Sequence, residues 1–188
     1  EKGRSNYRMG ALRPNQFGVD DAHVVEYVAS IAQASGEFLQ IVNFNLAGQQ
    51  YAVAGTVAGL KALEEDATKR TAEHGGKRPF MYVPGIDVPF HSTVLRSGVA
   101  DFRRKLDERI PAEIDPAKLV GRYIPNLVAR PFELTREFAQ SILDVVPSET
   151  VRELLETDGA WDAALANPGV LTRTLLIELL CWQFASPV

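Results

Sequence analysis

Four short apolar runs in the first part of the sequence have the pattern of β-strands. They are rich in residues that favour strands, are bounded by turn-forming residues, and cover Met9–Arg13, Leu39–Asn45, Gln49–Ala54 and Phe80–Val83. Only Leu46-Ala47-Gly48 separates the second run from the third. Because so short a link permits only an antiparallel connection, these two runs are predicted to form a β-hairpin.

Helical spacing of apolar residues separates these strands. A helix is predicted over 20–35, with Asp20 and Asp21 as its N-cap and first-turn acid and Gly36 as its stop. A second helix is predicted over 57–70, after Gly55 and Thr56. The resulting order βαββαβ is that of a ferredoxin-like subdomain, which we expect to cover residues 9–83.

The remaining sequence divides into two segments with different predicted structure. Residues 84–133 open with a proline-braced connection, continue into a helix that Ser92 or Thr93 can cap, and end in an extended stretch over 122–133. Residues 134–188 are predicted to be helical, over 135–146, 148–157 and 170–184. The last helix carries more apolar surface than one short helix can hide, so we expect it to pack on other parts of a longer chain or on a partner chain.

Composition narrows the class of protein. The 188 residues are 46% hydrophobic and 23% charged, as in ordinary globular proteins. A net charge of −4 argues against a nucleic-acid surface, and no apolar run has the length of a membrane helix. The single cysteine, Cys181, has no partner for an internal disulfide, which predicts a reducing, cytoplasmic location.

Among the titratable residues, His91 is the candidate for chemistry. It lies in Val88-Pro89-Phe90-His91-Ser92, at a predicted corner between a strand and a helix, where a structural or capping role is the alternative. A catalytic histidine needs a nucleophile, and the sequence contains no Gly-x-Ser-x-Gly motif. Cys181 lies in an apolar helix, where a thiol stays protonated. One cysteine and three scattered histidines do not have the spacing of metal ligands, so no metal is predicted.

Amide side chains gather around the predicted hairpin turn. Asn43, Asn45 and Gln49 lie within Asn43-Phe44-Asn45-Leu46-Ala47-Gly48-Gln49-Gln50. Amides in a turn commonly hydrogen-bond its backbone. The alternative is that they line a cleft that binds acyl thioester or pantetheine groups.

Together these two segments resemble a known family. Asn43-Phe44-Asn45-x-x-x-Gln49-Gln50-Tyr51-x-x-Ala54-Gly55, followed by Gly85-Ile86-x-Val88-Pro89-Phe90-His91-Ser92, is similar to the malonyl-CoA:acyl carrier protein transacylases. Tyr123-Ile124-Pro125-Asn126-Leu127 and the segment from Leu176 to Val188 are similar to the malonyl/palmitoyl transferase domain of the type I fatty acid synthases of fungi and actinomycete bacteria.

The resemblance implies a fold and a reaction. The fold would be a ferredoxin-like subdomain followed by part of an α/β-hydrolase-like acyltransferase core with a helical tail. The reaction would be ping-pong acyl transfer by a serine and a histidine, with His91 as the histidine and Asn43, Asn45 and Gln49 near the cleft. Coenzyme A thioesters and the phosphopantetheine of an acyl carrier protein domain would be the substrates, with no further cofactor.

Two features of the family have no match in this sequence. The family's serine and the arginine that pairs with the malonyl carboxylate precede the insert, and would precede Glu1. We therefore expect the chain to be the middle of a transferase within a large homo- or hetero-oligomeric synthase, and to be inactive alone. The alternative hypothesis is a non-catalytic ferredoxin-like module that binds a ligand or a protein.

Overall fold

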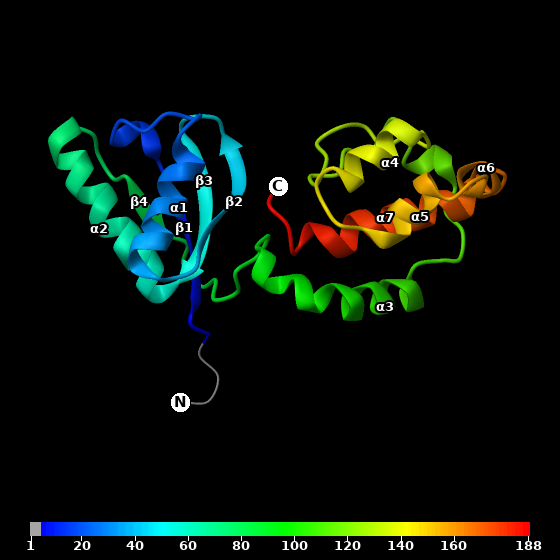
Figure 1. The fold of residues 1–188 in the computed structure, drawn as a ribbon, viewed down its shortest axis with the longest axis horizontal. Helices are drawn as coiled ribbons and strands as arrows, with labels where there is room; N and C mark the ends of the chain where they lie inside the picture. Colours follow the sequence, from blue (N-terminus) through cyan, green and yellow to red (C-terminus); the bar gives the residue numbers. More distant parts are fainter. Residues whose placement is uncertain (1–4) are drawn as a thin grey trace. The chain divides into compact units, whose positions relative to one another are not determined.

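The computed structural model describes residues 5–188, whose contacts divide them into two compact units (Figure 1). The first extends to Leu95, and the second covers Arg96–Ser186. The division expected from the sequence, at 83/84 and 133/134, stays a prediction.

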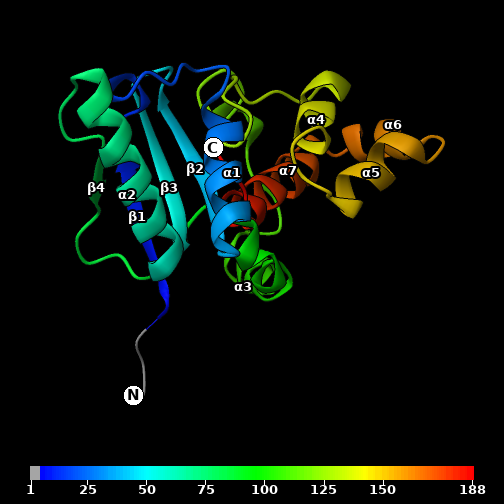
Figure 2. The ribbon, with the colours of Figure 1, turned by 60° about the vertical axis from the view of Figure 1, so that its left-hand side comes forward.

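The first unit is a four-stranded antiparallel sheet covered on one face by two helices. Its elements, in chain order, are β1 (Tyr7–Leu12), α1 (Val24–Ser35), β2 (Leu39–Leu46), β3 (Gln50–Thr56), α2 (Val57–His74) and β4 (Phe80–Tyr82), with a 3-10 turn at Pro14–Gln16. The strand order is β2-β3-β1-β4, and every neighbouring pair is antiparallel. This is the predicted ferredoxin-like arrangement, and Figure 2 shows α1 and α2 side by side over the sheet.

Strand alternation gives this sheet two different faces. The face under the helices buries the main core, which includes Leu12, Tyr51, Val53, Leu60 and Leu63. The opposite face, here called the back face, carries a smaller buried cluster of Met9, Val42 and Ala54. The chain that follows β4 packs there, through Val83 and Ile86.

The start of α1 differs from the prediction. The helix begins at Val24 instead of residue 20, and Asp20 and Asp21 lie in the turn before it. The Asp20 carboxylate accepts a hydrogen bond from the backbone N–H of His23 and contacts its ring, and it raises the pKa of that imidazole. The local bond therefore stabilises a turn instead of the helix end.

The second helix follows its capping signals closely. Thr56 is the N-cap of α2, and its hydroxyl accepts a hydrogen bond from Gly59 N–H at 3.0 Å. The helix continues to His74, beyond the predicted residue 70, and stops at Gly75, whose φ of 90° lies in the left-handed region.

The second unit is helical, and the described chain has no strand after Tyr82. A 3-10 segment over Thr93–Gly98 precedes α3 (Val99–Arg109), and another 3-10 turn covers Pro116–Lys118. The remaining helices are α4 (Arg136–Leu143), α5 (Glu149–Glu156), α6 (Ala160–Leu165) and α7 (Pro168–Gln183).

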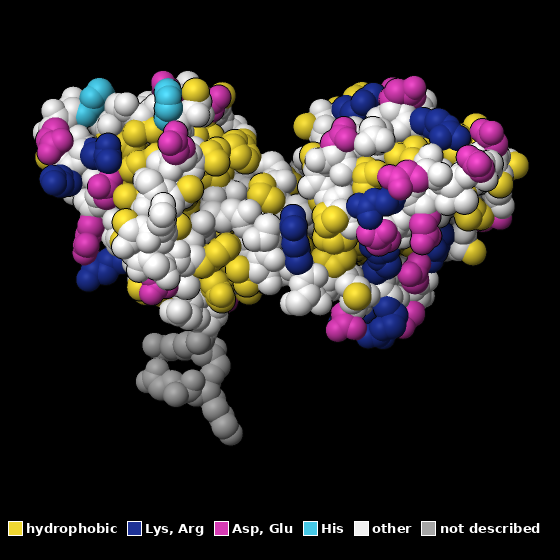
Figure 3. Space-filling model, viewed as in Figure 1, with side chains coloured by type: hydrophobic (Ala, Val, Ile, Leu, Met, Phe, Trp, Pro, Cys, Tyr) yellow, Lys and Arg dark blue, Asp and Glu magenta, His cyan; other side chains and the backbone are white. Residues whose placement is uncertain are grey.

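Two predictions for this unit are wrong in detail. The stretch 122–133 is not extended, because turns close on either side of Pro125 and the backbone N–H of Phe132 donates to Tyr123 C=O. The sequence pattern also missed α6, a single short helix that buries Trp161. Figure 3 shows acidic and basic side chains interspersed over the drawn surface of this unit.

Helix α7 is the centre of the second unit. Leu171, Leu175 and Leu179 are fully buried in a cluster with residues of α4, α5 and α6, and α3 packs along the helix as well. The expectation that this apolar face packs on missing parts of a longer chain or on a partner chain is therefore wrong for these three leucines. In the described part of the chain no helix is long and apolar enough to cross a membrane.

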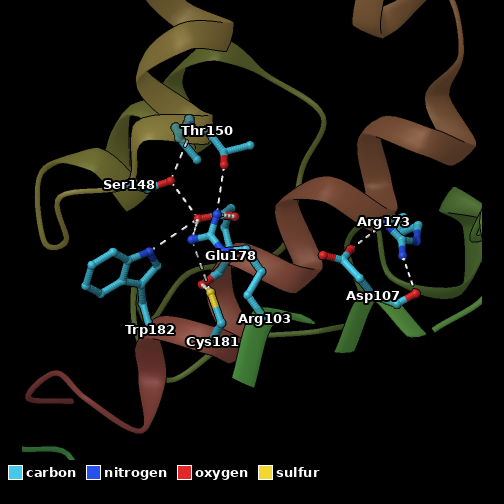
Figure 4. Close-up of polar contacts among 9 residues, drawn as sticks. Arg103, Asp107, Ser148, Thr150, Arg173, Glu178, Cys181 and Trp182 are labelled. Atoms are coloured by element: carbon cyan, nitrogen blue, oxygen red, sulfur yellow. Dashed lines mark hydrogen bonds and ion pairs between the residues drawn. The ribbon is translucent and has the colours of Figure 1, made fainter. Parts of the chain in front are cut away.

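A buried carboxylate joins three helices at this centre (Figure 4). Glu178 of α7 is 2% exposed, and Arg103 of α3 binds both of its oxygens, with Nη1–Oε1 at 2.7 Å and Nη2–Oε2 at 2.8 Å. Ser148, the N-cap of α5, and Trp182 donate to Oε2 at 2.7 and 3.2 Å. A two-pronged ion pair with further donors is the geometry in which a buried charge is compensated.

Removing the cation alone leaves that carboxylate buried with only neutral donors. We expect Arg103→Met to lower the free energy of unfolding of the second unit by about 3 kcal/mol. Both tryptophans of the sequence, Trp161 and Trp182, lie in this unit, so urea unfolding followed by tryptophan fluorescence reports on it. The double variant Arg103→Met/Glu178→Leu removes both charges and should recover most of the loss. Equal destabilisation of the single and double variants would contradict the assignment.

Candidate functional site

The segment that carries His91 belongs to the first unit and is tied to the back face of its sheet. Val83 N–H donates to Met9 C=O at 2.8 Å, which extends the pairing of β4 with β1. Ten residues later, the backbone N–H and the hydroxyl of Thr93 both donate to Oε1 of Gln40, at 2.9 and 3.1 Å. Gln40 lies opposite Ala54 in β3, and Ala54 lies opposite Met9 in β1, so the three share this face.

An irregularity in β2 brings Asn43 to the same face. Ile41 pairs with Val53, and Asn43 pairs with the next residue of β3, Ala52, so Val42 is an extra residue. Val42 and Ala52 both pack in the back-face cluster, which places Asn43 there too. Such a bulge turns a side chain to the face opposite to the one that simple alternation would give it.

The other two amides lie at the exposed end of the hairpin. Asn45 is near the end of β2, and Gln49 lies in the turn, not in the third strand as predicted. The turn is held by other groups: Gly48 N–H donates to the Tyr51 hydroxyl at 2.6 Å and to Asp21 at 3.2 Å. The Tyr51 hydroxyl also donates to Asp21, and burial together with this carboxylate raises the pKa of Tyr51. Among the hydrogen bonds of residues 5–188, none involves the amide groups of Asn43, Asn45 and Gln49.

The backbone at His91 has an uncommon conformation. Its φ of 59° is in the left-handed region, where histidine is found more often than most non-glycine residues, but at a cost in free energy. Pro89, two residues earlier, is buried and has a fixed φ. Ser92, the next residue, is fully buried, and its hydroxyl donates to Pro89 C=O at 2.6 Å. The half-buried His91 therefore stands at a sharp corner whose two sides are fixed.

Both predicted capping side chains have other roles at this corner. The Ser92 hydroxyl binds Pro89 and the Thr93 hydroxyl binds Gln40, so neither caps the following helix by its side chain. With its hydroxyl buried and donating to a carbonyl, Ser92 has no geometry for nucleophilic attack. Within residues 5–188 no cluster of histidine, cysteine, aspartate and glutamate could hold a metal ion.

Cys181 lies elsewhere, inside the second unit. Its thiol is fully buried beside the Glu178–Arg103 pair and donates to Glu178 C=O at 3.5 Å. Burial raises the pKa of this thiol to about 12. The group therefore stays protonated at neutral pH and has no role as a nucleophile.

Comparison with known proteins places this geometry in a family. The chain is 40% identical to Fatty acid synthase 2 of Mycosarcoma maydis over 99% of its own length, and 32% identical to the Saccharomyces cerevisiae fatty acid synthase subunit beta over 83%. This chain is homologous to one segment of the fungal type I fatty acid synthases. It spans only 6% and 10% of these two relatives. No family model matches the chain.

Solved structures show which fold this synthase segment has. The acyl-carrier-protein S-malonyltransferase of Burkholderia pseudomallei superposes with a TM-score of 0.57 at 20% identity, over 99% of this chain and 42% of that one. The malonyl-CoA:acyl carrier protein transacylase of Xanthomonas oryzae also gives 0.57, at 16% identity, over 100% of this chain and 42% of that one. The synthase segment therefore has part of the malonyltransferase fold.

Sequence reasoning missed three residues that shape this site. Gln40 and Asp21 carry polar groups whose partners lie 53 and 27 residues away in sequence, a separation that no local pattern reports. The bulge at Val42 has one trace in the sequence, since Ile41 and Val42 are adjacent apolar residues in an otherwise alternating strand.

Hydrogen exchange can test whether Asp21 and Tyr51 hold the hairpin turn by accepting from Gly48 N–H. Asp21→Ala removes one acceptor of the Gly48 N–H, so exchange of this amide should become roughly fivefold faster, as expected for one lost hydrogen bond. Asp20→Ala is the matched control, because Asp20 bonds only locally to His23, and it should leave Gly48 unchanged. Equal exchange rates of the Gly48 amide in the two variants would show that Asp21 does not hold the turn.

Burial of the Cys181 thiol predicts slow modification. At pH 8, a thiol reagent such as 5,5′-dithiobis(2-nitrobenzoate) should react with the native protein orders of magnitude more slowly than with the urea-unfolded protein. Stoichiometric labelling of the native protein within seconds would show that the thiol is exposed or ionised.

Proposed function

We propose that this chain supplies the catalytic histidine and part of the acyl-binding cleft of a malonyl/palmitoyl transferase within a type I fatty acid synthase. The observation that supports this most directly is the corner at His91. A half-buried imidazole, held by fixed neighbours on the sheet face that also carries Asn43, is suited to proton transfer at a defined point. Homology to fungal synthase chains and the malonyltransferase fold favour this function over a non-catalytic module.

In the proposed reaction, His91 acts as a general base and then as a general acid. Its imidazole takes the proton of a serine hydroxyl as the serine oxygen attacks the thioester carbonyl of malonyl-CoA. The C–S bond breaks, and the imidazolium returns the proton to the departing thiolate. The thiol of phosphopantetheine then attacks the acyl-serine while His91 takes the thiol proton. The bond between the acyl carbon and the serine oxygen breaks, and the imidazolium returns the proton to that oxygen, which restores the free serine and neutral His91. No serine of this chain has the required motif, so we infer that the nucleophile belongs to another part of the synthase and that this chain alone is inactive.

We assign the amide side chains a binding role in the same cleft. Asn43, Asn45 and Gln49 do not bond the turn backbone, so their amides can donate to the acyl or pantetheine carbonyl groups of a substrate. Of the three, Asn43 has the clearest support, because the bulge places it on the same face as the His91 segment.

The proposed partners are an acyl carrier protein domain and the remaining parts of a large synthase. One solved structure that shares this fold, with a TM-score of 0.53 at 15% identity over 99% of this chain and 42% of that one, is described as a malonyl-transacylase in complex with a polyketide synthase acyl-carrier protein. We also propose a reducing cytoplasmic location, for which the free cysteine Cys181 is the supporting observation.

Loss of the base should slow transfer without unfolding the protein. In the complete synthase, His91→Ala is expected to lower the rate of malonyl transfer from coenzyme A to the carrier protein by about 10²- to 10⁴-fold. Single-turnover transfer of radiolabelled malonyl groups measures this rate. His74→Ala is the matched control, since His74 is exposed at the end of α2, and its transfer rate should match that of the wild type. Near-normal loading of the carrier protein by His91→Ala would exclude the proposed role.

A further inference from the structure

We propose that Gln40 is a positioning residue for the transferase reaction, which acts by fixing the His91 corner to the sheet. This inference rests on the proposed function of His91. Gln40 lies outside the amide segment 43–50. It acts through Thr93, two residues after the histidine.

The geometry of Gln40 suits an anchor. A single oxygen, Oε1, accepts both the backbone N–H and the hydroxyl of Thr93, so it binds the main chain as well as a side chain. The glutamine stands on β2, whose backbone is paired with β3 on either side of Gln40 through Leu39 and Ile41. A side chain on a paired strand is a more rigid support than one on a loop.

The corner needs such an anchor because its conformation is costly. A left-handed backbone at a non-glycine residue persists only when its surroundings enforce it. Within the segment, the Ser92 hydroxyl donates to Pro89 C=O and so closes a hydrogen bond across His91. This bond is local and moves with the segment. The Gln40–Thr93 pair of bonds ties the C-terminal side of the corner to the sheet itself.

Loss of this tie should affect the chemical step more than substrate binding. The His91 segment would keep its sequence and its local bonds, but the ring could shift relative to the face that carries Asn43. Misplacement of a catalytic group by about 1 Å can cost on the order of 100-fold in rate. The expected signature is therefore a lower kcat with little change in KM.

The test compares two variants of nearly equal size in the complete synthase. Gln40→Met keeps the length of the side chain but removes the acceptor, and it should lower kcat of malonyl transfer by about 10- to 100-fold with KM changed less than about threefold. Gln40→Glu keeps an acceptor oxygen at the same reach and should retain kcat within about threefold of wild type. Thermal unfolding of each variant reports whether the domain remains folded.

A third substitution keeps the proposal testable if Gln40→Met does not fold. Thr93→Val removes the hydroxyl bond and leaves the backbone N–H donor, so it should lower kcat by about 3- to 10-fold with little change in KM, and an unchanged kcat would contradict the positioning role. Where Gln40→Met folds, its loss of kcat should be the larger. In the double variant Gln40→Met/Thr93→Val, the effects should not add, because both remove the same tie.

The outcomes separate this proposal from the proposed function. Wild-type kcat in Gln40→Met, or a loss that Gln40→Glu does not restore, would overturn the positioning role while His91→Ala still abolishes transfer. Unaltered transfer in His91→Ala would instead overturn the function itself.

Discussion

The hydrogen bonds that join the segment after β4 to strands β1 and β2 determine where His91 lies. Without them, residues 83–93 would be a surface connection with two prolines and one strained residue. With Thr93 bonded to Gln40 and Val83 bonded to Met9, both ends of that connection are fixed to the back face of a four-stranded sheet. The ferredoxin-like arrangement makes these bonds possible, because its two helices cover one face of the sheet and the connection after β4 packs on the other.

The bulge in β2 is the second constraint on the site. It puts Asn43 on the back face although strict alternation from Ile41 would have put it under the helices. The Asp21–Tyr51–Gly48 contacts hold the far end of the same hairpin, so polar groups of the turn backbone are satisfied without using the amide side chains. This is the condition that the proposed substrate-binding role of the amides requires.

Local pattern was enough to predict most of the first unit. Apolar alternation and helical spacing identified all four strands and both helices, because these elements bury one face each and therefore repeat with their own period. Asp20 and Asp21 misled the start of α1, since aspartate stabilises turns as readily as helix ends. The role of Gln40 could not be predicted, because its bonds depend on tertiary folding that joins residues far apart in sequence.

In the helical unit, too, local pattern predicted helices but not the contacts between them. Leucine spacing in α7 identified the helix but not its burial, which depends on α4, α5 and α6 folding around it. Glu178 gave no signal at all, because an isolated acid in an apolar helix has the same pattern whether or not an arginine reaches it. The extended stretch predicted over 122–133 failed because its apolar residues anchor turns against this core instead of pairing as a strand.

We propose that the His91 corner presents an imidazole to a nucleophile supplied by another part of a synthase. An experimental structure of the complete transferase domain tests this most directly, through the distance from a ring nitrogen of His91 to the nearest serine hydroxyl. We expect a separation of about 2.6–3.2 Å, the range in which a base can take the proton. A complete domain in which His91 faces no hydroxyl or thiol, and another residue contacts the acylated serine, would contradict it.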